Sequence, residues 1–333
     1  MNVTEFKHSH SAHCESGVMV SLLRHYGLNL SEPMIFGLSS ALTFAYLPFI
    51  KIGGMPLVAY RNLPKSIIKN IQKNLKIKMK LETFSSKEKG EARLDELLSE
   101  GKVTGAQTSV YWLPYFPPEM RFHFNAHNLV IYAKESDNYL ISDPVFEHSV
   151  KSDKASLSKA RFAKGMMAPK GLLYYPTFVP QNIDLQPIII KTMKKTAKAM
   201  LNTPVPISGL KAIKYLAKSI LKLESKDEKY AKLYLGHIVR MQEEIGTGGA
   251  GFRYIYASFL QESSTLFNND STLQEASTMM LEVGDKWREF ALLIAKAIKS
   301  KKPIDFTSIS NMLMSISDEE AKVYTKMLEF TGK

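Results

Sequence analysis

The second half of this 333-residue chain reads as a succession of helices. From about residue 185 onward, apolar residues recur at the spacing that places them on one face of a helix. Prolines and a glycine-rich segment separate six predicted helices, which cover roughly 185–201, 208–223, 226–245, 251–268, 271–299 and 307–330. A chain that ends in this way is restricted to folds with an all-helical C-terminal domain.

The first half mixes short helices with strands. Its clearest β pattern is the pair of apolar runs 128–133 and 139–142, which flank the polar segment 135–138 and predict an antiparallel hairpin. Further strands are expected over 103–112 and 172–176. We therefore predict the α+β class, with a mixed domain over residues 1–182 and a helical domain over 183–333.

The only cysteine of the chain, Cys14, lies at the predicted start of a helix. Val18, Leu22 and Tyr26 follow at helical spacing, and Gly27 fits just past the helix end. The positive end of the helix dipole favours the thiolate, which is the nucleophilic form of cysteine. A buried structural cysteine is the alternative interpretation of this residue alone.

The predicted hairpin places a histidine and an aspartate together. If its turn centres on Ser136, position 129 pairs with Asp143, and His127 lies diagonally across on the same face. Such diagonal neighbours are about 7–8 Å apart, within reach of an imidazole and a carboxylate. The sequence therefore predicts a catalytic triad in which Cys14 is the nucleophile, His127 the base and Asp143 the group that orients it.

The N-terminal part resembles the butirosin biosynthesis protein H family. The resemblance covers about residues 8–175 and rests on short motifs that keep their order, among them His13-Cys14-Glu15-Ser16, Tyr111-Trp-Leu-Pro-Tyr115 and His127-Asn-Leu-Val-Ile-Tyr132. The C-terminal half resembles the helical domain that often follows it, through the segment Gly246–Arg253 and Tyr256-Ala-Ser-Phe-Leu260.

This resemblance implies a papain-like fold and acyl transfer from a carrier-protein thioester to an amine. The acyl group would arrive on phosphopantetheine carried by the donor, so no cofactor of the protein's own is expected. More distant relatives, the leader peptidases of bacteriocin exporters, carry a glutamine six residues before the cysteine that donates to the oxyanion. Here that position is His8, so His8 and its competitor His13 are the candidate oxyanion donors.

The substrate is expected to meet three groups of residues. The first is Glu15 beside the nucleophile, the second comprises the aromatic segments 36–46 and 111–116, and the third is the glycine loop with its following arginine. The candidates are Glu15, Phe44, Tyr46, Tyr111, Trp112, Tyr115, Gly248, Gly249 and Arg253.

The net charge of +12 and the basic helix predicted at 63–75 indicate an acidic macromolecular partner, which the resemblance specifies as an acyl carrier protein. No groove-reading motif points to nucleic acid. A single cysteine, no signal peptide and no membrane-spanning run predict a cytoplasmic protein. The small amine acceptor and the oligomeric state are not specified by the sequence.

Several other patterns are set aside. Gly246-x-Gly248-x-x-Gly251 fits the dinucleotide pattern but follows a helix instead of a strand. The histidines near Cys14 lack a second cluster that would complete a metal site. Two alternative functions remain: a cysteine peptidase or amidohydrolase with the same triad, and a non-catalytic binding protein. A degenerate scaffold would be expected to lose at least one of the three triad residues, and all three are present.

Overall fold

The computed structural model describes residues 5–332 and divides into two compact units. The first unit contains residues 5–35 and 67–183, and the second contains 36–66 and everything from 184 onward. The chain passes from the first unit to the second within α2 (Glu32–Leu38). The α+β class is confirmed, but the expected division at residue 182 is wrong for residues 36–66, which belong with the C-terminal helices.

The first unit is built on a six-stranded antiparallel sheet with the order β3-β8-β4-β5-β6-β7. Its strands are β3 (Lys78–Glu82), β4 (Thr104–Thr108), β5 (His127–Glu135), β6 (Asn138–Ser142), β7 (Val150–Asp153) and β8 (Leu173–Phe178). Its helices are α1 (Cys14–His25), α3 (Ser66–Asn74), α4 (Lys87–Ser99) and α5 (Lys154–Arg161), with short 3-10 turns η1 (Val110–Trp112) and η2 (Pro118–Met120).

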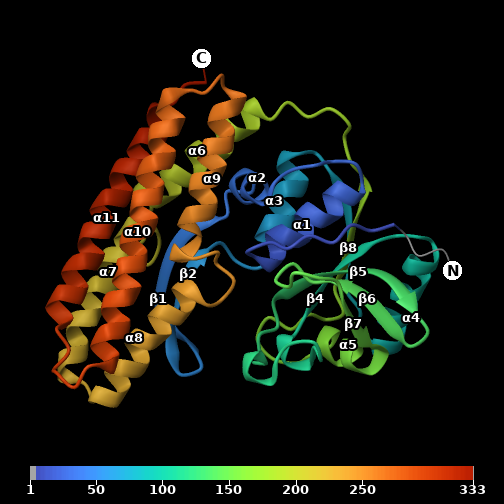
Figure 1. Ribbon diagram of the computed structural model, residues 1–333, viewed down its shortest axis with the longest axis horizontal. Helices are drawn as coiled ribbons and strands as arrows, with labels where there is room; N and C mark the ends of the chain where they lie inside the picture. The colour runs from blue at the N-terminus through green and yellow to red at the C-terminus, as the bar shows by residue number, and fades with distance from the viewer. Residues whose placement is uncertain (1–4, 333) are drawn as a thin grey trace. The chain divides into compact units, whose positions relative to one another are not determined.

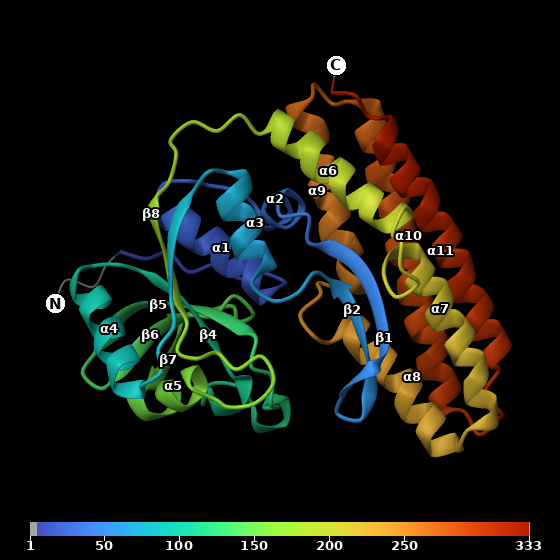
Figure 2. The ribbon, with the colours of Figure 1, turned by 180° about the vertical axis from the view of Figure 1, so that it is seen from behind.

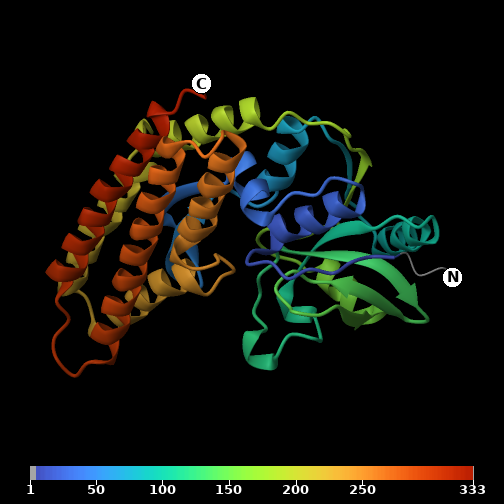
Figure 3. The ribbon, with the colours of Figure 1, turned by 45° about the horizontal axis from the view of Figure 1, so that its top comes forward.

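Helices cover both faces of this sheet (Figures 1 and 3). On one face α1 packs against β4, β5 and β8. Every residue of α1 from Cys14 to Leu23 is buried, as expected for a helix that is surrounded on all sides. On the other face, Leu97 of α4 and Leu157 of α5 share an apolar core with Leu129 and Ile131 of β5. The sheet therefore holds α1, and with it Cys14, in a fixed place.

The second unit consists of a two-stranded hairpin packed on helices (Figure 2). The hairpin is β1 (Leu42–Ile52) and β2 (Met55–Arg61). The helices are α6 (Gln186–Leu201), α7 (Gly209–Leu221), α8 (Glu228–Glu243), α9 (Arg253–Leu266), α10 (Ser271–Lys299) and α11 (Phe306–Glu329), with 3-10 turns η3 (Lys222–Ser225) and η4 (Ala250–Phe252). No helix among residues 5–332 combines the length and the apolar character that crossing a bilayer requires.

Aromatic side chains explain why the hairpin leaves the first unit. Phe44 of β1 packs against Tyr60 of β2 and Trp287 of α10, with ring centroids 5.2 and 5.8 Å apart. The hydroxyl groups of Tyr46 and Tyr234 are 2.6 Å apart. These large rings are buried among helices of the second unit, and this burial stabilises the hairpin there.

A buried ion pair lies at the centre of the second unit. Arg253 at the start of α9 donates from Nε to Glu320 of α11 at 2.9 Å, and neither side chain is exposed. The carboxylate also accepts hydrogen bonds from Trp287 and Tyr324, so each of its oxygens is satisfied. The guanidinium donates in addition to the carbonyl of Gly251, which ties the glycine loop to the helical core.

We expect Arg253→Met to lower the free energy of unfolding by about 3–5 kcal/mol, because it leaves the buried Glu320 carboxylate without its counter-charge. Urea unfolding of the purified protein measures this change. Adding Glu320→Gln should restore part of the loss, whereas Lys214→Met, which breaks an exposed pair with Asp318, should have little effect. Equal losses for Arg253→Met and Lys214→Met would contradict the role given to the buried pair.

Candidate active site

Cys14 is the first residue of α1 and is almost completely buried. His13 caps the helix, since its Nδ1 lies 3.3 Å from the Ser16 amide that donates to it. At the first position of a helix the backbone N–H has no intrahelical partner, and the helix dipole is positive. Both features favour negative charge on the Cys14 sulfur and on a reacting oxygen beside it.

A partly buried carboxylate, Glu32, braces this helix start. Glu32 accepts hydrogen bonds from the amides of Ala12 and His13 at 2.8 and 2.9 Å, and from the Ser16 hydroxyl at 2.8 Å. Burial raises the pKa of Glu32, an effect that these three donors partly oppose. The Glu32 carboxylate therefore fixes the course of the backbone just before the nucleophile.

His127 and Asp143 meet as the hairpin predicts. His127 begins β5 and Asp143 follows β6, and Nε2 of the histidine lies 2.7 Å from Oδ2 of the aspartate. The same oxygen accepts the hydroxyl of Tyr115 at 2.8 Å, and Oδ1 accepts the amide of Val145 at 3.3 Å. The Asp143 side chain is completely buried, so these donors replace the water it has lost.

A β-bulge sets the register at this end of the hairpin. Glu135 pairs with Asn138 at the turn, and the ladder shifts by one residue between Ile131 and Ala133, so that Val130 pairs with Ser142. Continued by one residue, this register brings Asp143 opposite position 129, as the sequence predicts. The bulge compensates for a turn that is centred half a residue beyond Ser136.

Cys14 contacts the same histidine. Burial alone would lower the pKa of His127, but the charge of Asp143 and the hydrogen bonds that the ring donates to Asp143 and to the Cys14 sulfur outweigh it and raise the pKa to about 10. Because Nε2 is bonded to Asp143, Nδ1 is the ring nitrogen left to face the sulfur. The Cys14 sulfur therefore lies beside an imidazolium whose far side is held by the Asp143 carboxylate.

Close packing joins the helix to the aspartate turn. A methyl group added at Gly17 would lie 2.6 Å from the Pro144 and Ser11 side chains, so only glycine fits where α1 meets this turn. The amide of Ser11 donates to the Pro144 carbonyl at 2.7 Å. The segment before the nucleophile and the turn that bears Asp143 therefore form one packed unit.

The structure thus brings Cys14, at the start of a helix packed against the antiparallel sheet, together with His127 and Asp143. Two family models match the chain. The model described as "Butirosin biosynthesis protein H, N-terminal" matches residues 13–144, which confirms the resemblance inferred from the motifs. The model described as "Domain of unknown function (DUF4872)" matches residues 155–327, more than half of the chain.

The chain belongs to the DUF4872 family.

Among solved structures, one titled "Crystal structure of an putative C39-like peptidase from Bacillus anthracis" is similar to this DUF4872 protein. The similarity covers 54% of this chain and 98% of the other, at 13% identity and a TM-score of 0.36. No curated protein matches the chain.

His8 was expected to donate to the oxyanion, but its side chain bonds to the loop around Asp143. Its Nε2 donates to the carbonyl of Phe146 at 3.0 Å and its Nδ1 lies 2.7 Å from the Ser142 hydroxyl. With both nitrogens bonded, His8 is not placed to donate to an oxyanion, and the expectation that it does is wrong for this structure. His13 is buried directly beside the nucleophile, and its role as an oxyanion donor stays a prediction.

Glu15 and Tyr115 support the site instead of lining it. The Glu15 carboxylate is completely buried and accepts the amides of Ile67 and Ile68 at the start of α3. The Tyr115 hydroxyl donates its hydrogen bond to Asp143. The contacts of Glu32 and Ser142 with the segment before Cys14 were not identified from the sequence. No sequence pattern indicates which carboxylate or hydroxyl will bond to a segment that is distant along the chain.

The candidates in the second unit lie in its core. Phe44, Tyr46 and Arg253 are buried, and Arg253 has its charge neutralised by Glu320, so none of them offers a free surface to a substrate. Gly249 is buried as well, and an added methyl group there would lie 2.6 Å from the Arg288 guanidinium. Gly248 is exposed, and its contact with substrate stays a prediction.

Tyr111 and Trp112 are partly exposed, at 40% and 37% of their surfaces. They form η1 directly after β4, whose last residue, Thr108, pairs with His127. The two rings contact each other edge to face, with centroids 5.0 Å apart, and Lys159 lies over the Trp112 ring. This position near the histidine keeps both residues as candidates for contact with substrate.

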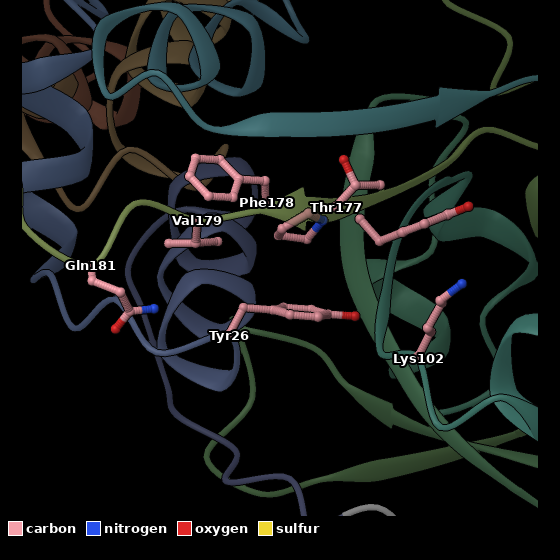
Figure 4. Close-up of a pocket in the computed structure, with 8 residues that line it drawn as sticks. Tyr26, Lys102, Thr177, Phe178, Val179 and Gln181 are labelled. Carbon is pink, nitrogen blue, oxygen red and sulfur yellow. The ribbon is translucent and has the colours of Figure 1, made fainter.

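A cavity of about 410 Å³ in the first unit is not lined by Cys14, His127 or Asp143. Tyr26, Lys102, Phe178 and neighbouring residues of the segment 175–181 line it (Figure 4). Tyr26 caps the C-terminal end of α1, about 18 Å along the helix from Cys14. Within residues 5–332, no group of three or more His, Cys, Asp or Glu side chains is arranged to hold a metal ion.

The raised pKa of His127 predicts how Cys14 reacts with alkylating reagents. Below about pH 10 His127 should be an imidazolium that attracts an anionic reagent. The rate of alkylation by iodoacetate, relative to that by neutral iodoacetamide, should therefore be raised. This increase in the rate ratio should disappear as pH rises through about 10. Asp143→Asn removes the charge that raises the pKa of His127. The increase in the rate ratio should therefore disappear at a lower pH in this variant than in wild type. The measurement is the ratio of the two alkylation rates as a function of pH.

Asp137→Asn is the matched control, because Asp137 is an exposed carboxylate in the turn of the same hairpin. A ratio that changes at the same pH in wild type and Asp143→Asn would show that the aspartate does not set the charge of His127.

Proposed function

We propose that the protein is a cysteine-dependent acyltransferase that joins an acyl group, delivered as a carrier-protein thioester, to an amine. The observation that carries the proposal is the buried Cys14–His127–Asp143 arrangement at the start of α1. The match of residues 13–144 to a butirosin biosynthesis protein H domain supports a place in antibiotic or other specialised biosynthesis.

The first half-reaction moves the acyl group to the enzyme. The Cys14 thiolate attacks the thioester carbonyl, and the phosphopantetheine sulfur leaves with the proton of the His127 imidazolium. The products are an acyl-Cys14 thioester, a free phosphopantetheine thiol and a neutral His127. The oxyanion would be stabilised by the backbone N–H of Cys14 at the positive end of α1.

The second half-reaction releases the product. The amine attacks the acyl-Cys14 carbonyl while Nδ1 of His127 takes its proton, and collapse of the intermediate restores thiolate and imidazolium. Water can attack in place of the amine, and the product is then a free acid. Cys14, His127 and Asp143 are each less than one-tenth exposed, and exclusion of water from such a site favours the amide.

We expect Cys14→Ala to abolish both acyl transfer and a covalent adduct while leaving the fold intact. Intact-mass spectrometry of wild type with an acyl-carrier thioester should show the acyl mass on the enzyme, and a panel of amines should yield amides. His10→Ala, an exposed histidine of the same segment, is the matched control and should behave as wild type.

Free acid in place of amide with every amine would identify a hydrolase. Unchanged product formation by Cys14→Ala would rule out covalent catalysis, and no adduct or product from wild type with any thioester would favour a binding protein.

The partner proposed for this reaction is an acidic acyl carrier protein that binds α3. Lys69 and Lys73 are exposed one turn apart on this helix, and neither joins an ion pair among the described residues. The start of α3 is tied to Glu15, next to the nucleophile. Lys73 is six residues beyond Ile67, about 9 Å along the helix axis. A negatively charged protein held there would lie near the thiol that it serves.

Charge reversal by Lys69→Glu and Lys73→Glu should lower kcat/KM for the carrier-bound donor and leave kcat nearly unchanged. The effect should shrink with salt, since the Debye length falls from about 10 Å at 0.1 M to about 3 Å at 1 M. A small thioester without the carrier should react equally with both enzymes.

Lys191→Glu with Lys195→Glu on α6 is the matched control, because these lysines are also exposed and one turn apart. A loss confined to the α6 variant would move the docking surface there. Equal losses on carrier and small thioester would mean that the α3 changes damage the enzyme itself.

A further inference from the structure

The side chain of His8 bridges two points of the loop that carries Asp143. Nε2 donates to the carbonyl of Phe146 at 3.0 Å, and Nδ1 shares a hydrogen bond of 2.7 Å with the hydroxyl of Ser142. Ser142 directly precedes Asp143, and Phe146 closes the turn through its amide, which donates to the Asp143 carbonyl at 3.1 Å. One imidazole therefore spans the turn from end to end.

This bridge lies beside other contacts between the same two segments. Three residues after His8, the amide of Ser11 bonds to Pro144. Phe146 packs edge to face against Phe116, which in turn packs against the His127 ring with centroids 5.4 Å apart. A shift of the turn would thus move both the carboxylate that orients His127 and the aromatic ring that contacts it.

We propose that His8 is a positioning residue, which holds the Asp143 turn against the segment that leads to Cys14. This inference rests on the proposed function, in which His127 must stay aligned between thiolate and carboxylate. His8 acts through Asp143 and touches neither the sulfur nor the acyl group. The position that supplies an oxyanion donor in the leader peptidases is thereby used here to fix the orientation of the catalytic pair.

Alkylation of Cys14 by iodoacetamide distinguishes a positioning role of His8 from a role as oxyanion donor. This reagent is attacked at a saturated carbon, so no carbonyl oxyanion forms, and loss of an oxyanion donor cannot slow it. Loss of alignment between Cys14 and His127 does slow it, above all near pH 6, where an ordinary thiol, with a pKa near 8.5, is almost wholly protonated. The reaction needs no substrate and therefore does not depend on which acyl group or amine the enzyme uses.

We expect His8→Ala to lower the alkylation rate near pH 6 by about tenfold, with a smaller loss at high pH where any thiol is ionised. Ser142→Ala should have a similar effect, and the double variant should be no worse than His8→Ala, because each of the three variants breaks the same bridge across the turn. His8→Gln has an acceptor and a donor at the end of its side chain and should recover part of the rate.

Each other outcome has a defined meaning. If His8→Ala lowers acyl transfer but alkylates as wild type does, His8 is an oxyanion donor and the proposal is overturned. Additive losses in the double variant would also overturn it. If His8→Ala does not fold, His8→Gln and Ser142→Ala carry the test. If wild type itself alkylates near pH 6 no faster than a free thiol, the proposed function fails, and that result is distinct from a failure at His8.

Discussion

The buried carboxylate of Asp143 is the constraint on which the first unit depends. An isolated charge without access to water is strongly unfavourable, so the fold must bring donors to it from several directions. They come from the loop after η1 through Tyr115, from the start of β5 through His127 and from the adjacent amide of Val145. In satisfying the charge, these contacts orient the imidazole toward Cys14. Stability of the turn and alignment of the site are thus the same physical requirement.

Other carboxylates, buried or partly buried, organise the molecule in a similar way. Glu32 gathers the amides before Cys14, and Glu15 caps the start of α3. In the second unit Glu320 gathers Arg253, Trp287 and Tyr324 from three helices. Each carboxylate joins elements that are distant in sequence, and each is directional, because hydrogen bonds specify orientation where apolar packing tolerates several arrangements.

Local patterns could be read from the sequence because they depend on neighbours along the chain. The helical spacing after residue 185, the helix that begins at Cys14 and the hairpin of 128–133 with 139–142 all appear where expected. The short strand β7 and the helix α5 carry weaker patterns and were not foreseen. The hairpin β1–β2 was missed as well, since its continuous apolar residues resemble a pocket lining as much as a strand buried on one side by helices.

The sequence by itself determined the fold class and the helix start that bears Cys14. It also determined that His127 and Asp143 meet, because a hairpin register follows from chain-local pairing. Only the tertiary structure decided which remaining polar groups face the site. Glu15, His8 and Arg253 lie in motifs suited to substrate contact. In the structure each side chain instead forms a hydrogen bond to a residue 52 or more positions away in the same chain. Such pairings depend on how packed elements come together in space, and a linear pattern of residues does not contain that information.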